Sequence, residues 1–91
     1  MNASLSTLKK DGQTLLWHGL ALIPLVKAHG SPLRLTHLPS IGQRIHQARS
    51  WFKAAMQQND HGGKYHYTYC LKASSLRCIV DEVLMHDCHL E

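Results

Sequence analysis

Apolar residues recur at helical spacing between residues 40 and 58. Ser40 and Gln43 have the spacing of a capping box at the start of this stretch, in which each side chain would satisfy a free backbone amide of the first turn. A cluster of turn-forming residues at positions 59–63 ends the pattern. The spacing predicts a long amphipathic helix over residues 40–58 with one stripe packed in the core. The stripe consists of Ile41, Ile45, Ala48, Phe52 and Met56, and Trp51 and Ala55 widen it.

Residues 65–71 are rich in tyrosine and read as a strand. Successive side chains of a strand point to opposite faces, so the segment divides into two sets. The bulky set should pack against covering helices, whereas the second set leaves room beside a lysine at the strand's end. The bulky set is Tyr65, Tyr67, Tyr69 and Leu71, and the second set is His66, Thr68, Cys70 and Lys72.

A second amphipathic helix is predicted over residues 75–86, with Ser74 or Ser75 as its N-terminal cap. Residues 87–91 begin a further strand, so strand, helix and strand predict a right-handed parallel unit. Ligands of α/β proteins bind at the carboxyl ends of parallel strands. Lys72 lies at such an end and is therefore a candidate for chemistry, with an ordinary solvated lysine as the alternative.

The N-terminal part of the chain is less regular. Residues 1–13 are polar and are expected to be frayed. The apolar run at 15–26 is too short to cross a membrane and lacks a clear cleavage site, so neither a membrane nor a signal peptide is expected. A short helix over about residues 20–26, with Gly30 as its stop, should lead into a strand at 32–38.

Charge and cysteine usage exclude several classes. The formal net charge is +4, but the ten lysines and arginines are spread along the chain, whereas a nucleic-acid site gathers them in a patch. Three cysteines without a Cys-x-x-Cys pair predict no disulfide framework and suit a reducing cytoplasm. His86, Cys88 and His89 invite a metal interpretation, but their places on a helix end and on opposite strand faces favour ordinary structural roles.

The segment Tyr69-Cys70-Leu71-Lys72-Ala73-Ser74 resembles the Tyr-Ala-x-Lys-Ala-Asn signature of the fold-type III pyridoxal-phosphate decarboxylases. These include the diaminopimelate, ornithine and biosynthetic arginine decarboxylases. Cys70 and Ser74 stand where the family usually has alanine and asparagine. Residues 30–39 are similar to a Gly-Thr-Pro-Leu segment that leads into a strand in the same family. The two segments occur in the family's order, the resemblance covers about residues 20–91, and it looks most like the arginine decarboxylase branch.

This resemblance implies an α/β fold, namely the opening β-α-β-α(-β) portion of an alanine-racemase-like (β/α)8 barrel. Residues 1–38 would form an N-terminal segment with a short helix and a strand of the family's β domain. Residues 39–91 would form the first units of the barrel that binds the cofactor. A complete barrel takes ~250 residues, so the 91-residue chain is expected to be an incomplete, N-terminal piece of such an enzyme.

The resemblance also implies a function. Lys72 matches the family lysine that forms the Schiff base with pyridoxal 5′-phosphate, so it is the expected catalytic and cofactor-binding residue. The substrate would be a basic amino acid, with arginine, converted to agmatine for polyamine biosynthesis, preferred over ornithine, lysine and diaminopimelate. The phosphate and ring contacts would lie beyond Glu91, and the full-length enzyme would be a homodimer, so this chain alone is expected to be inactive. The alternative is a non-catalytic small α/β module that binds a partner through its sheet edges.

Overall fold

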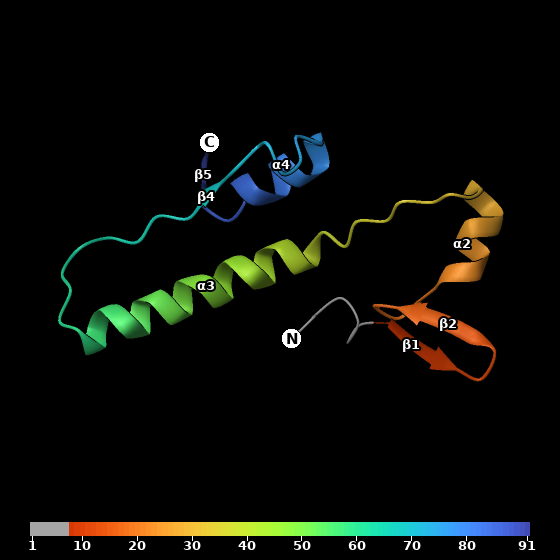
Figure 1. Ribbon diagram of the computed structural model, residues 1–91, viewed down its shortest axis with the longest axis horizontal. Coiled ribbons are helices and arrows are strands. Elements are labelled where there is room, and N and C mark those ends of the chain that lie inside the picture. Colours follow the sequence, from red (N-terminus) through yellow and green to blue (C-terminus); the bar gives the residue numbers. More distant parts are fainter. Residues whose placement is uncertain (1–7) are drawn as a thin grey trace. The chain divides into compact units, whose positions relative to one another are not determined.

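The protein, represented by a computed structural model that describes residues 8–91, is an α/β chain with three helices and two small sheets (Figure 1). It divides into two compact units, Met1–Thr36 and His37–Glu91. No closed barrel forms among the described residues. None of the described helices has the length and apolar character that crossing a membrane requires.

The first unit is an antiparallel meander followed by a helix. Strand β1 (Leu8–Asp11) pairs with β2 (Thr14–Trp17), β2 pairs with β3 (Leu20–Ala21), and helix α2 (Leu22–His29) follows directly. The second two-residue connection, His18–Gly19, has φ values of 49° and 80°. Two positive φ values are those of a type I′ turn, whose twist matches that of the flanking strands. Glycine adopts this conformation without steric cost, which explains why the chain can reverse so tightly here.

The expectation that residues 1–13 are frayed is wrong for the described part of that segment, since β1 begins at Leu8. Residues 1–7 lie outside the described residues. All four residues of Leu8–Asp11 are exposed, so their sequence shows no alternation of apolar and polar positions. A periodic pattern therefore could not predict this strand. The tight turn Gly12–Gln13 that joins β1 to β2 was the signal that could have revealed it, since glycine at the first position of a two-residue turn is typical of a hairpin.

Helix α2 confirms the predicted N-terminal helix. Pro24 is its third residue, where the missing backbone N–H disturbs no helical hydrogen bond. The backbone N–H of Gly30 donates to the carbonyl of Val26 at 2.7 Å and closes the last turn, as expected. The predicted strand at residues 32–38 is wrong, because residues 33–37 are irregular in the structure. An extended segment becomes a strand only when a neighbour pairs with its backbone, and no described strand does so here.

The second unit carries a long helix and a parallel β-α-β element (Figure 1). Helix α3 (Pro39–Gln58) precedes strand β4 (Thr68–Tyr69), helix α4 (Arg77–Leu84) and strand β5 (His89–Leu90). Strands β4 and β5 pair in parallel, as the sequence predicts. The two predicted helices are confirmed, although α4 is two residues shorter at each end than residues 75–86.

The predicted strand at residues 65–71 is confirmed in position but is much shorter. Only Thr68 and Tyr69 form the ladder, although backbone hydrogen bonds continue on both sides of it. The N–H of His89 donates to the carbonyl of Tyr67 at 2.9 Å, and the N–H of Leu71 donates to the carbonyl of Glu91 at 2.8 Å. The segment is thus extended and paired around its centre, while residues 64–66 have no regular structure.

The predicted capping box of α3 is wrong. The helix begins one residue early, at Pro39, whose fixed φ suits a first helical position. The hydroxyl of Ser40 instead lies 2.6 Å from Nδ1 of His37. Neither N-cap residue, Leu38 of α3 or Leu76 of α4, makes a side-chain capping hydrogen bond. Ser74 comes nearest to the predicted cap of α4, because its hydroxyl accepts a 3.4 Å hydrogen bond from the N–H of Leu76.

The core of the second unit is small. Ile45 of α3 and Val83 of α4 are each 1% exposed and are the only fully buried apolar side chains among the described residues. The predicted apolar stripe of α3 is therefore only partly packed, since Ile45 is buried but Phe52 within the stripe is 53% exposed and Trp51 beside it is 64% exposed. Gly42 of α3 is also buried and lies close to the side chain of His86, which follows α4 in the chain.

Candidate functional site

Lys72 lies in a turn that joins β4 to α4. The turn spans Leu71–Ala73, begins two residues after the last residue of β4, and ends before α4 starts at Arg77. The side chain is exposed. Lys72 therefore stands at the carboxyl end of a parallel strand, where the sequence predicts it.

Three hydrogen bonds hold this turn. The N–H of Ala73 donates to the carbonyl of Cys70 at 3.1 Å and closes the turn around Leu71 and Lys72. The N–H of Leu71 donates to the carbonyl of Glu91 at 2.8 Å, which fixes the start of the turn to the strand beside it. The hydroxyl of Tyr69 donates to the carbonyl of Ser74 at 2.8 Å, across the whole turn. Lys72 is thus carried on a backbone segment that is tied at both ends.

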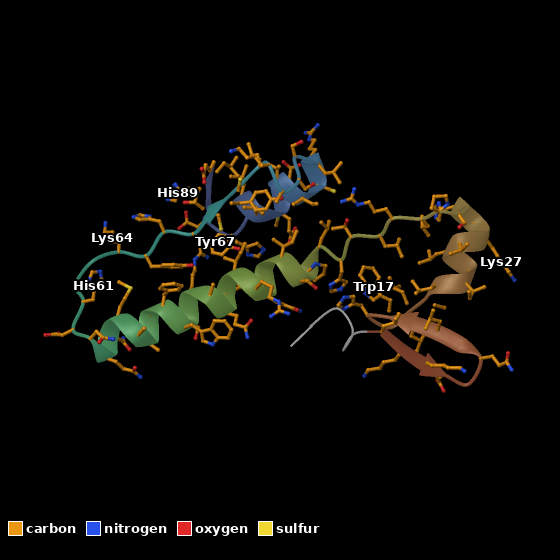
Figure 2. The ribbon with its side chains drawn as sticks, viewed as in Figure 1. Trp17, Lys27, His61, Lys64, Tyr67 and His89 are labelled. Carbon is orange, nitrogen blue, oxygen red and sulfur yellow. The ribbon has the colours of Figure 1, made fainter. Side chains whose placement is uncertain are left out.

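The two predicted faces of the tyrosine strand are confirmed except at Cys70. Tyr65, Tyr67, Tyr69 and Leu71 are all half-buried, and His66, Thr68 and Lys72 are exposed, but Cys70 of the second set is half-buried as well. The ring of Tyr65 stacks on Phe52 of α3, with centroids 4.5 Å apart and planes 13° from parallel. Figure 2 shows Tyr67 between the strand segment and α3. The helices therefore cover the bulky face, and the face of Lys72 is open.

Two imidazoles stand on the open face. Thr68 and His89 are register partners in the ladder, so they share a face, and His66 shares it by alternation. The rings of His66 and His89 meet edge to face with centroids 5.1 Å apart. His89 is labelled in Figure 2. The open face thus presents the imidazoles of His66 and His89 and the hydroxyl of Thr68, and the exposed amine of Lys72 follows in the turn after the strand.

The three residues considered as metal ligands have separate neighbours. Nε2 of His86 lies 3.3 Å from Oε1 of Glu82, and its ring meets His46 edge to face at 5.5 Å. Cys88 lies beside Arg49, and His89 lies beside His66. Within residues 8–91, no three of the histidine, cysteine and acidic side chains are grouped so that they could hold a metal ion.

Cys88 has a contact with Arg49 that the sequence does not predict. A guanidinium nitrogen of Arg49 in α3 donates to the carbonyl of Asp87 at 2.5 Å and lies 3.7 Å from the sulfur of Cys88. Burial raises the pKa of the Cys88 thiol, while the charge of Arg49 opposes this change and that of Asp87 adds to it. No local pattern links residues 49 and 88, so only the packed structure could reveal this contact.

The comparisons add no relative: no protein-family model, no curated protein and no solved structure matches this chain.

Proposed function

We propose that this chain is the N-terminal part of a pyridoxal-phosphate-dependent decarboxylase of fold type III, in which Lys72 holds the cofactor. The observation that carries the proposal is the position of Lys72 at the carboxyl end of β4, in a parallel β-α-β unit. That position agrees with the resemblance of residues 69–74 to the family signature. The finer fold, the opening of an alanine-racemase-like barrel, is part of the same proposal.

The residues present fit the covalent anchor of the cofactor. A carbonyl compound needs a primary amine that it can reach, and Lys72 is an exposed amine on a backbone fixed by hydrogen bonds. The thiol of Cys70 and the methyl group of Ala73 are the small side chains next to it in the turn. The resemblance assigns the phosphate and ring contacts to later parts of the barrel. Among the described residues, Lys72 is therefore the one that would hold the group.

The cofactor would supply an electron sink for the carbanion that forms when carbon dioxide leaves the substrate. The chain's own contribution is the amine of Lys72, which attacks a carbonyl carbon once it has lost its proton. The half-buried tyrosine face fixes the strand to α3 and leaves the other face free. As the proposed anchor, Lys72 would thus be reachable, since its side chain is exposed in the turn after the strand.

The further parts of the proposal rest on the resemblance. The substrate is a basic amino acid, with arginine preferred and ornithine, lysine and diaminopimelate as the alternatives. The working form is a homodimer. The three free cysteines suit the cytoplasm, where thiols stay reduced.

The test uses the protein expressed from the complete open reading frame that contains these residues. It is incubated with pyridoxal phosphate, reduced with borohydride and mapped by peptide mass spectrometry. We expect the label on Lys72, and we expect Lys72→Ala to lose it together with arginine decarboxylation, because the anchor is removed. The fold should persist, since the side chain is exposed.

Lys64→Ala is the matched control, because Lys64 is also an exposed lysine of the second unit (Figure 2). This variant should keep both the label on Lys72 and the activity. A label that is spread evenly over the exposed lysines, or that lies on a lysine other than Lys72, overturns the proposal. That outcome would favour the alternative of a small module that binds a partner.

A further inference from the structure

We infer that Tyr69 is a positioning residue for Lys72, an inference that rests on the proposed function. The hydroxyl of Tyr69 donates to the carbonyl of Ser74 at 2.8 Å. The bond starts three residues before Lys72 and ends two residues after it. It therefore closes a loop of backbone that contains the whole turn and its lysine.

The geometry of the turn explains why this bond matters. The Cys70–Ala73 hydrogen bond shapes the turn, and the Leu71–Glu91 bond fixes its first residue to the neighbouring strand. Neither bond holds the backbone after Ala73. The Tyr69 hydroxyl reaches Ser74, where the chain leaves the turn and approaches α4, so it restrains the side that the other two bonds leave free.

Tyr69 differs in this respect from the other two tyrosines of the same face. Tyr65 is held by its ring, which stacks on Phe52. Tyr67 is half-buried like Tyr69, but the described part of the structure records no hydrogen bond from its hydroxyl. The hydroxyl of Tyr69 is thus the one that joins the strand to the far side of the lysine turn. The ring of Tyr69 lies on the covered face, so it does not occupy the open face where Lys72 would carry its ligand.

The consequence is that the Lys72 amine has less conformational freedom. When the backbone on both sides of a lysine is fixed, fewer orientations remain for its Cα–Cβ bond, so the amine samples a smaller volume. A reacting group that is already ordered needs less ordering when its partner binds. Loss of the Tyr69 hydroxyl should loosen the turn while the strand pairing and the apolar contacts of the ring remain.

The experiment compares Tyr69→Phe with Tyr67→Phe in the protein from the complete reading frame, with pyridoxal phosphate as the probe. The amine condenses with the aldehyde of the probe and releases one water. Borohydride then adds hydride to the new carbon–nitrogen double bond and leaves a stable secondary amine. Peptide mapping gives the ratio of label on Lys72 to label on Lys64. The circular dichroism of the bound probe, recorded in its own absorbance band, reports how firmly it is oriented.

We expect Tyr69→Phe to lower the Lys72-to-Lys64 ratio about fivefold, the effect of one net hydrogen bond. The dichroism per bound probe should fall as well, whereas Tyr67→Phe should change neither quantity. A wider structural loss would alter the far-ultraviolet spectrum, which should stay unchanged in both variants. Tyr69→Phe should lower the melting temperature by no more than the few degrees that the loss of one net hydrogen bond accounts for.

The possible failures are distinguishable. If the unsubstituted protein carries no preferential label on Lys72, the proposed function fails and this inference fails with it. If Lys72 is labelled but Tyr69→Phe keeps the ratio and the dichroism, only the role of Tyr69 is overturned. Unfolding of Tyr69→Phe would likewise overturn it, because the hydroxyl would then serve the fold and not the orientation of the lysine.

Discussion

Replacement of Gly42 by alanine tests the packing of α3 against His86, the second residue after α4. A Cβ atom built on Gly42 would lie 2.6 Å from both Cε1 and Nε2 of His86, which is closer than real contacts allow. The imidazole would have to move. It is held by Glu82 at 3.3 Å and by the ring of His46, and the side chains of His86 and Glu82 are only 21% and 22% exposed.

Two effects of this substitution oppose each other. Alanine in place of glycine stabilises a helix by up to ~1 kcal/mol, and less than this near the helix start. Overpacking costs about 1–3 kcal/mol when neighbours must leave their preferred rotamers. Displacement of His86 also weakens its contact with Glu82, which as a pair one helical turn apart contributes about 0.2–0.5 kcal/mol. The clash outweighs the helix propensity, so we expect Gly42→Ala to lower the free energy of unfolding by about 1 kcal/mol.

The assay is urea unfolding followed by far-ultraviolet circular dichroism. A loss of about 1 kcal/mol corresponds to a midpoint that is lower by roughly 0.3–1 M urea for a small protein. The control is Gly62→Ala, because nothing lies within 4 Å of a Cβ atom at Gly62. That variant should leave the midpoint almost unchanged.

The double variant Gly42→Ala/His86→Ala identifies the cause. Without the imidazole, alanine at position 42 keeps only its favourable propensity, so it should stabilise this background by up to ~1 kcal/mol. The coupling between the two positions should then be about 2 kcal/mol, within the range for residues in contact. Equal effects of Gly42→Ala with and without His86 would refute the reasoning.

Three further predictions follow from burial and pairing. Because burial raises the pKa of Cys88, its alkylation rate should reach half its maximum above pH 9.0, the ordinary thiol value. Arg49→Gln should raise the pH of half-maximal alkylation further, because the charge of Arg49 lowers the pKa of the thiol. Lys53→Gln is the control and should leave that pH unchanged. The unfolded thiol loses its proton first, so Cys88 should also make the free energy of unfolding fall as the pH rises past 9.0. Ile45→Ala should cost about 2–5 kcal/mol in urea unfolding, whereas Trp51→Ala should cost far less because that side chain is 64% exposed. The 91-residue chain alone should be marginally stable or self-associate in sedimentation experiments, because its strand edges are unpaired; a sharp two-state melt of a monomer would contradict this.

The elements of the second unit could be predicted because their patterns are local. The stripe through Ile45 requires only helical spacing, and the alternation around Tyr67 requires only that successive strand residues point in opposite directions. The helix starts were harder to predict. The spacing of Ser40 and Gln43 fits a capping box, but the hydroxyl of Ser40 hydrogen-bonds to His37 instead of to a first-turn amide. Which partner the hydroxyl takes depends on the folded structure and not on the local sequence.

The strands of the first unit were missed because their sequence signals are weak when each is taken alone. Strand β1 is exposed throughout, so burial leaves no mark on its sequence. Strand β3 has only two residues, Leu20 and Ala21, and leads directly into a helix. The apolar pattern of this segment therefore predicts only the helix. The turn at His18–Gly19 is a sequence signal for a hairpin, but a two-residue turn identifies a hairpin only when the strands on both sides of it are recognised.

The position of the candidate lysine could likewise be predicted from local sequence, whereas the contacts around the site could not. Lys72 was found because its strand, turn and helix follow one another in the sequence. The contact between Tyr69 and Ser74 spans only five residues, yet no periodic pattern marks it, because it depends on the angle at which the chain leaves the turn. The contact between Arg49 and Cys88 joins residues 39 positions apart and requires α3 to lie beside the segment that leads into β5. Sequence periodicity therefore places a reactive group on an element, while the hydrogen bonds that restrain it follow from how that element is joined to its neighbours.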